Sequence, residues 1–224
     1  MNRNLCSALL AAVLTSFGGC ATVQPTALDS KTYGGVLKQN GVSVLVYAER
    51  PLYVKTPGSV AGTGLIDDFT KPDGTVVNLP SVSRLVAQSL RESLISQSGL
   101  DVAPLPDELL PTKDADQNTL PAGQGKRYVL KVSVQINSLY YRPMAWSTYQ
   151  YMLNARGALV DPSDGKTVWQ DVCKVGGASE DTTLQLDRTE FKNNDGEKLK
   201  NIMRQSARRC ANELAGKLRL TGGS

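Results

Sequence analysis

The sequence predicts an α+β domain in which two amphipathic helices pack on a mixed, mostly antiparallel sheet. Apolar and polar residues alternate over residues 127–136 and 148–160, which indicates long strands with a buried face. Apolar residues recur at helical spacing over residues 81–98 and 195–218. Strands that follow one another, with helices before and after them, are typical of the α+β class.

The first twenty residues have the features of an export signal. Arg3 precedes an apolar run over residues 5–17, which is too short to span a bilayer as a stable anchor. The run closes on Phe17-Gly18-Gly19-Cys20. This phrase resembles the lipobox of bacterial lipoproteins, in which small residues precede a cysteine that receives a diacylglyceryl group before cleavage. An ordinary secretory signal with a chance cysteine and an uncleaved membrane anchor are the alternatives.

The lipobox resemblance divides the chain into three parts. Residues 1–19 are predicted to be the signal peptide, residues 20–32 a lipidated tether, and residues 33–224 one periplasmic domain. Cys20 is the predicted site of lipidation. Ala21 follows it, and by resemblance to bacterial sorting rules an Ala there implies the outer membrane.

The first half of the domain is predicted from local patterns. Residues 42–47 are mainly apolar at both odd and even positions, which indicates a central strand covered on both faces. Residues 57–78 are rich in Gly, Pro and Asp and are expected to form a long loop or a hairpin around Asp73-Gly74. A helix over residues 81–98 is expected to end at Gly99. A short strand at residues 100–102 and an irregular excursion over residues 104–125, with four prolines, are expected next.

The second half is predicted to be an antiparallel meander followed by a helix. Its strands are expected at residues 127–136, 148–160 and 167–173, with one face of the first strand buried and the other exposed to solvent. In the last helix, over residues 195–218, the spacing of apolar residues places Cys210 on the buried face.

Composition restricts the chemistry available to the chain. It has no His, so it has no Ser-His-Asp triad, no Cys-His dyad and no imidazole metal ligand. Its 25 Lys and Arg residues against 21 Asp and Glu give a net charge of +4, and removal of Arg3 with the signal leaves +3. This surplus does not indicate a nucleic-acid partner. We therefore expect no enzyme activity, no catalytic residue, no metal and no cofactor.

Export predicts different roles for the four cysteines in the sequence. Cys6 is removed with the signal and Cys20 carries lipid, so Cys173 and Cys210 remain. Two thiols in an oxidising compartment are expected to pair, which predicts a disulfide between the third meander strand and the last helix. A catalytic thiol is the competing interpretation, but neither cysteine lies in a Cys-x-x-Cys motif.

Two surfaces are candidates for binding a partner. Five aromatic residues lie near the turn at residues 142–145, and two of them, Tyr149 and Tyr151, are expected to be buried. The remaining candidates at this hairpin are Tyr141, Arg142 and Trp146, which could contact a partner or a membrane interface. The last helix has a local basic excess whose candidates are Arg204 and Arg208, although a solvated helix face explains that excess equally well.

The order of these elements resembles that of small periplasmic lipoproteins with the fold of the TolB amino-terminal domain, of penicillin-binding-protein activators, and of curli and exopolysaccharide secretion lipoproteins. The resemblance rests on Ser98-Gly99-Leu100-Asp101-Val102 and on Asp164-Gly165-Lys166 followed by Trp169. It implies a lipid-anchored accessory or assembly protein of an envelope machine, attached to the membrane by its lipid, bound to an envelope protein complex and able to form a homo-oligomer. A lipid- or polysaccharide-binding carrier is the alternative.

Overall fold

The computed structural model describes residues 23–55, 78–115, 120, 127–142, 145–177, 181–191, 193–218 and 220. The signal peptide, Cys20 and the predicted hairpin at Asp73-Gly74 lie outside these residues. The elements are, in order, α1 (Ser30–Asn40), β1 (Val42–Val46), β2 (Tyr53–Lys55), α2 (Val82–Ser98), η2 (Thr112–Asp114), β3 (Tyr128–Arg142), β4 (Ala145–Val160), β5 (Thr167–Val175), η3 (Thr182–Leu184), β6 (Gln185–Asp187), η4 (Arg188–Phe191), η5 (Asn193–Gly196) and α3 (Glu197–Lys217).

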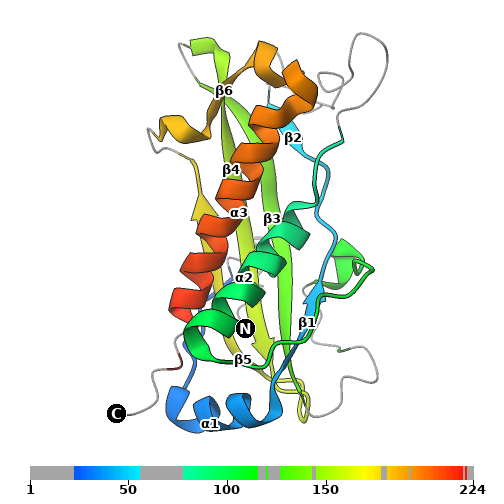
Figure 1. Ribbon diagram of the computed structural model, residues 1–224, viewed down its shortest axis with the longest axis vertical. Helices are drawn as coiled ribbons and strands as arrows, with labels where there is room; N and C mark the ends of the chain where they lie inside the picture. Colours follow the sequence, from blue (N-terminus) through cyan, green and yellow to red (C-terminus); the bar gives the residue numbers. More distant parts are fainter. Residues whose placement is uncertain are drawn as a thin grey trace, which may run out of the picture.

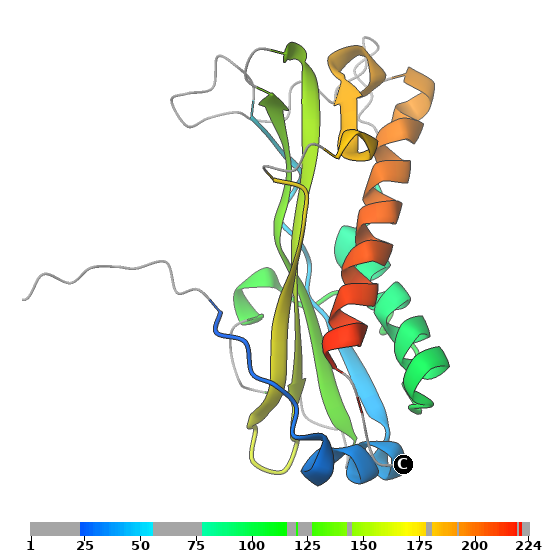
Figure 2. The same cartoon turned by 90° about the vertical axis from the view of Figure 1, so that its left-hand side faces the viewer.

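The strands form one mixed sheet of six strands, mostly antiparallel, which confirms the predicted fold class. β3, β4 and β5 make the expected antiparallel meander. β1 and β2 both pair with β3 in parallel, whereas β6 pairs with β4 in antiparallel fashion. The sheet is therefore β1-β3-β4-β5 at one end and β2-β3-β4-β6 at the other. α2 and α3 lie side by side on one face of this sheet (Figures 1 and 2).

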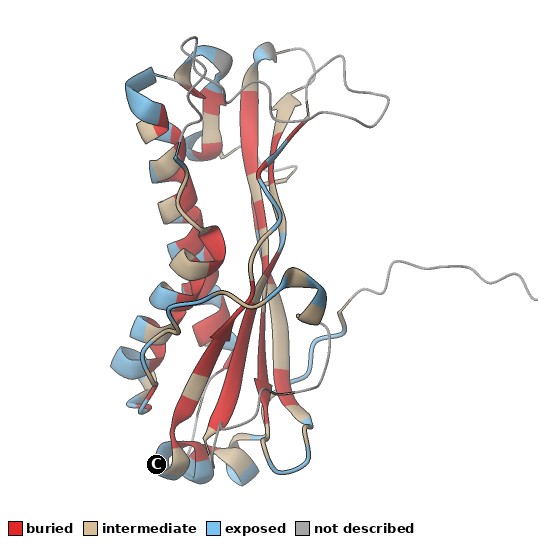
Figure 3. Ribbon diagram, turned by 90° about the vertical axis from the view of Figure 1, so that its right-hand side faces the viewer, coloured by how far each residue is buried: buried red, intermediate tan, exposed pale blue. Residues whose placement is uncertain are grey.

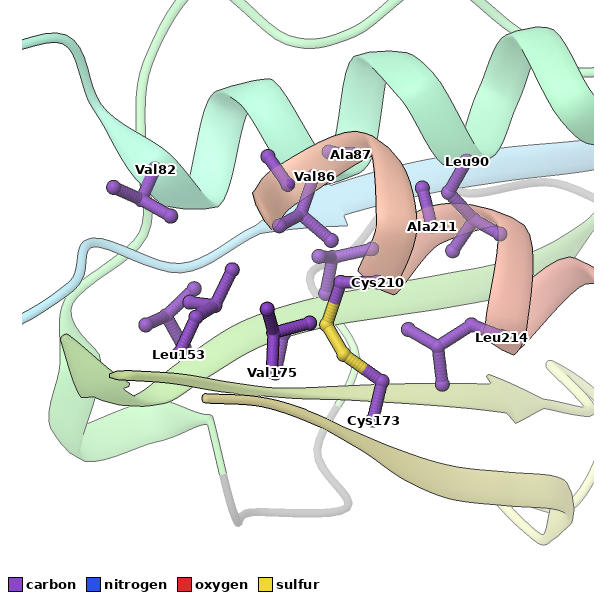
Figure 4. Packing of buried hydrophobic residues seen from close by; sticks show 14 of the residues in the cluster. Val82, Val86, Ala87, Leu90, Leu153, Cys173, Val175, Cys210, Ala211 and Leu214 are labelled. Atoms are coloured by element: carbon purple, nitrogen blue, oxygen red, sulfur yellow. A yellow bond between two sulfur atoms is a disulfide. The ribbon is translucent and has the colours of Figure 1, made fainter. Parts of the chain in front are cut away.

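Helix α2 begins and ends as its sequence predicts. The side chain of Ser81 accepts a hydrogen bond from the Arg84 amide at the start, and Gly99 takes the left-handed conformation, at φ 62°, at the end. The apolar stripes of α2 and α3 meet over the sheet. Figure 4 shows them converging on Leu153, Cys173 and Val175 of the strands below. Burial of these stripes stabilises the helices far more than their own hydrogen bonds do.

A β-bulge in β3 reverses which face of the sheet each residue occupies. Val134 pairs with Ala155 and Ile136 with Asn154, so Gln135 is the extra residue. Even-numbered residues of β3 face the helices before the bulge, and odd-numbered ones do so after it. The predicted alternation is therefore wrong beyond Val134.

Strand β1 is covered on both faces as expected, but it is not central. It pairs with β3 alone among the strands, and isolated bridges join its ends to Val102 and Leu110. Its residue Leu45, with Tyr47 just beyond it, belongs to a second small core on the face opposite the helices, which Leu110 helps to cover. The described part of the 104–125 excursion is thus packed against the domain (Figure 3). The first half of β3 is consequently buried on both faces, where a solvated face was predicted.

The chain before β1 contains a helix that the sequence analysis did not predict. Asp29 caps α1 through hydrogen bonds from the backbone amides of Lys31 and Thr32. Ahead of it, Thr26 pairs with Gln170 of β5, so part of the predicted 20–32 tether contacts the sheet. Among the described helices, none is long and apolar enough to cross a bilayer.

Candidate functional site

The predicted disulfide is present between Cys173 of β5 and Cys210 of α3. Their Cα atoms are 5.4 Å apart, and both side chains are fully buried between the sheet and the helices (Figure 4). The bond holds the middle of α3 on the sheet. Neither sulfur is then available as a nucleophile in the oxidised protein.

The hairpin candidates do not lie on a common surface. Tyr141 is on the helix side of the sheet because of the bulge, and its ring packs partly against the main core. Arg142 ends β3, pairs with Ala145 and lies on the opposite face, where it is partly exposed. Trp146 belongs to β4, but its side chain and the turn residues 143–144 lie outside what is described. Tyr149 and Tyr151 are buried, as expected.

Strand β2 adds residues to this end of the sheet that the sequence analysis missed. The ring centroids of Tyr53 and Tyr140 are 6.5 Å apart in an edge-to-face arrangement, and Lys55 Nζ lies 5.9 Å from the Tyr140 ring centroid. We call Tyr53, Lys55 and Tyr140 the aromatic patch. Tyr53 is 38% exposed, an unusual value for a large ring in this domain. Only the parallel pairing of β2 with β3 brings these residues together, so no local pattern could have revealed them.

The basic face of α3 is largely neutralised by carboxylates. Arg204 lies 2.9 Å from Glu197, and Lys198 lies 2.6 Å from Glu190. Three further cations of this helix are paired, namely Lys200 with Asp195, Arg209 with Asp181, and Lys217 with both Asp171 and Glu213. Arg208 is exposed and has no ion pair among the described residues. The sequence count of basic residues therefore overstates the positive charge of this surface.

Hydrogen bonds to two of these carboxylates lower their pKa. The Thr183 hydroxyl and then Arg209 hold the pKa of Asp181 below its ordinary value. Lys198 does the same to Glu190, assisted by the Asp187 amide. Both carboxylates belong to the segment between β5 and α3, so they fasten that segment to the helix.

A first cavity has a volume of about 340 Å³. It is lined mainly by the connection between β1 and β2, by the residues just before α2, and by Asn137 of β3. Its carboxylate, Glu49, accepts hydrogen bonds from the Val82 amide (2.8 Å) and the Ser81 hydroxyl (3.0 Å), and so caps α2. Its amide, Asn137, accepts a hydrogen bond of 2.8 Å from the Tyr151 hydroxyl, whose pKa is raised by burial. The polar groups of this cavity thus hold the fold together.

A second cavity, of about 610 Å³, opens beside the start of α3. We call it the amide cleft, because amide side chains dominate its lining. The lining residues are Thr183, Glu190, Asn193, Asn194, Glu197, Lys198, Asn201, Ile202 and Gln205. Most of them are exposed, whereas Ile202 is buried and forms part of the floor. Sequence reasoning missed the cleft because η3, η4 and η5 have no periodic signal.

The described part of the chain contains no cluster of three or more Cys, Asp or Glu side chains that could hold a metal ion. The carboxylates near the amide cleft face cations or backbone amides, as Glu190 does, instead of one another. This arrangement suits recognition by hydrogen bonds.

Comparison with known proteins gives weak similarities. No family model matches the sequence, and no characterised protein matches it. Among solved structures, the chain is similar to a DUF330-family protein from Xanthomonas campestris, at 14% identity over 79% of this chain and 81% of that one, with a TM-score of 0.42. It is also similar to a subunit of the PelC dodecamer from Paraburkholderia phytofirmans, at 14% identity over 88% of this chain and 96% of that one, with a TM-score of 0.42. A third similar structure is lipoprotein GNA1162 from Neisseria meningitidis, at 16% identity over 64% of this chain and 90% of that one, with a TM-score of 0.32. The function is therefore argued from the residues of this chain.

Proposed function

We propose that the chain is a lipid-anchored accessory or assembly protein of the bacterial envelope, held at the outer membrane by Cys20, that binds a partner protein in the periplasm. The observation that supports this proposal is the amide cleft. Its volume lies within the range of ligand sites, about 300 to 1,000 Å³. Its side chains both donate and accept hydrogen bonds, which matches the exposed backbone of a protein loop or strand edge.

The surroundings of the cleft favour recognition over chemistry. Asn201 and Gln205 are exposed one helical turn apart on α3, and the disulfide holds that helix in place. The ion pair between Glu190 and Lys198 lies at the cleft and orders the opposite wall. A preformed wall lowers the entropic cost of binding.

Affinity capture from crosslinked envelopes tests this proposal. The lipidated protein should recover a specific protein partner, and the double variant Asn201→Ala/Gln205→Ala should lose that partner. Gln97→Ala, an exposed amide at the far end of α2, is the matched control and should retain it. Equal recovery by all three forms would refute the role of the cleft. Recovery of glycan or lipid in place of protein would favour the carrier function.

Lipid anchoring has its own test. Replacement of Cys20 by Ser should release the protein from the membrane fraction, and the mature wild-type protein should have the mass of a lipidated chain beginning at Cys20. Persistent membrane association of the Cys20→Ser variant would refute the anchor. A homo-oligomer remains a prediction, which sedimentation of the purified protein would test.

A further inference from the structure

The segment before α1 determines where the chain enters the domain. Thr26 and Gln170 exchange two backbone hydrogen bonds of 2.8 and 3.0 Å, and the side-chain amide of Gln170 donates a third, of 2.6 Å, to the carbonyl of Gln24. The described chain therefore begins beside β5. Figures 2 and 3 both show this segment on the side of the sheet away from α2 and α3.

The length of chain between Cys20 and this attachment is short. Six residue steps separate Cys20 from Thr26. A fully extended chain covers at most about 3.5 Å per residue, so this connection reaches no more than about 20 Å. A strand of the length of β4 (16 residues) extends over about 50 Å by comparison. A lipid on Cys20 consequently holds the bilayer close to β5, on the side of the sheet away from α2 and α3.

The strands of the sheet carry charge of mainly one sign on that side. The excursion with η2 covers β1 and the first half of β3 there and brings Asp114 close to Tyr47, so the uncovered part is the other end of the sheet and β5. Strand parity places Lys55, Arg142 and Lys174 on this face of the sheet. The same parity places two further cations there: Arg156, whose guanidinium donates a hydrogen bond to Gln170, and Lys131, which is buried beside the Tyr47 ring. Among the described strand residues, Asp187 of β6 is the only carboxylate on this face, because Asp171 points to the helix side, where it pairs with Lys217. Cations at a membrane surface are attracted to anionic head groups.

The aromatic patch lies on the same face. Tyr53 and Lys55 are on the parity of β2 opposite the buried Val54, and Tyr140 is the register partner of Lys55. A tyrosine ring with one apolar side and a polar hydroxyl suits the interface between lipid and water. The patch and the cations together provide both kinds of contact that a peripheral membrane surface uses.

We propose that the face of the sheet opposite α2 and α3 lies against the membrane and binds anionic phospholipid head groups through Lys55, Arg142, Lys174 and the aromatic patch. The amide cleft, in the helix layer, then faces away from the membrane. This orientation rests on the proposed lipidation of Cys20, whereas the affinity of the face for anionic lipid does not.

Chemical footprinting of lysines tests the orientation with native residues as probes. The lipidated protein is reconstituted into vesicles of phosphatidylethanolamine and phosphatidylglycerol and treated with a membrane-impermeant amine-acylating reagent, and modification is quantified by mass spectrometry. Lys55 and Lys174 should become several-fold less reactive than in detergent solution. Lys198, in the helix layer with a side chain 49% exposed, is the internal control and should not change. Protection of Lys198, or equal reactivity of all three lysines, would overturn the orientation.

A second measurement separates this inference from the lipid anchor. In the unlipidated Cys20→Ser protein, Lys55→Gln/Lys174→Gln should reduce sedimentation with phosphatidylglycerol vesicles by about tenfold. Arg209→Gln/Lys217→Gln, which removes two charges from the helix layer, is the matched control and should leave it unchanged. Equal losses of vesicle binding in both variants, or unchanged binding by Lys55→Gln/Lys174→Gln, would overturn the cationic face. A mature chain without lipid at Cys20 would overturn the anchor alone.

Discussion

The two sides of the sheet treat charge differently. On the helix side, cations of α3 are matched by carboxylates that come from its own first turns, from the segment between β5 and α3, and from β5. On the open side, the described strands carry five cations, of which Lys131 is buried, against one carboxylate, Asp187. The sequence carries no local mark of this difference, because the carboxylates that pair with α3 come partly from distant segments.

This difference in charge pairing indicates a different role for the charged residues on each side of the sheet. Ion pairs within the helix layer fasten α3 and its preceding turns to one another, so little net charge is left to attract an external partner. Cations that share a sheet face repel one another weakly in the isolated domain, and an approaching anionic surface relieves that repulsion. The charges of the helix layer thus stabilise the fold, whereas the cations of the open face are suited to an anionic surface outside the chain. Four predictions test this contrast, ordered from the largest expected effect.

Loss of the disulfide should have the largest effect, because it joins the two layers. Reduction, or replacement of Cys173 and Cys210 by Ala, should lower the free energy of unfolding by about 3 to 4 kcal/mol for a closed loop with a sequence separation of 37. Urea denaturation in the Cys20→Ser background measures it. A reductant should have no effect on the double-Ala variant. A loss in the wild type below about 1 kcal/mol would show that packing alone holds α3 on the sheet.

Gly157→Ala should disturb the packing between the sheet and α3. The added Cβ would lie 2.9 Å from Cη2 of Trp169, a fully buried ring, so the ring or the strand must shift. Overpacking of this kind costs about 1 to 3 kcal/mol, measurable by thermal or urea unfolding. Gly216→Ala is the matched control, since its Cβ meets nothing within 4 Å in α3, and it should stabilise the protein by up to about 1 kcal/mol. Equal effects of the two substitutions would contradict the tight contact at Gly157.

Glu190→Gln should reveal the ion pairs of the helix layer through pH. Hydrogen bonds from Lys198 and the Asp187 amide lower the pKa of Glu190 below its ordinary value of 4.5. The ionised form therefore stabilises the fold above about pH 4.5, and this contribution is lost as the pH falls through the lowered pKa. At pH 7 the variant should be less stable by no more than about 1 kcal/mol, because the pair is partly exposed. The difference in unfolding free energy between wild type and variant should shrink below pH 4.5, and a difference independent of pH would contradict this role.

Lys174→Gln should have the smallest effect on stability. Lys174 is exposed on the open face, and substitutions at such positions usually change the free energy of unfolding by less than about 0.5 kcal/mol. A urea titration at low salt is the measurement. Destabilisation by more than 1 kcal/mol would mean that the cations of the open face serve the fold instead of an external surface.

Local patterns in the sequence predicted the parts of the fold that depend on local interactions. The long strands and the stripes of α2 and α3 follow from periodicity, and Ser81 and Gly99 mark the ends of α2. Helix α1 was missed because it contains Gly34 and Gly35 and buries little apart from Leu37. The bulge at Gln135 was missed because an extra residue in one strand is defined only by its partner strand.

The candidate sites depended even more on long-range contacts. The aromatic patch exists because β2 pairs with a strand more than eighty residues later in the chain. The neutralisation of α3 depends on Asp171 of β5 and on Asp181 and Glu190 of the segment between β5 and α3. Of the predicted partner-binding residues, Arg142 lies on the open face, while Tyr141 is partly packed into the core.

The sequence by itself determined the class of the fold, the meander, the two covering helices and the pairing of Cys173 with Cys210. These features follow from hydrophobic periodicity and from the small number of cysteines, which are properties of short segments or of composition. The tertiary structure alone decided which residues share a face, which charges are neutralised and where the chain enters the domain. The physical reason is that strand register, a single bulge and ion pairs between distant segments depend on contacts that no local stretch of sequence contains.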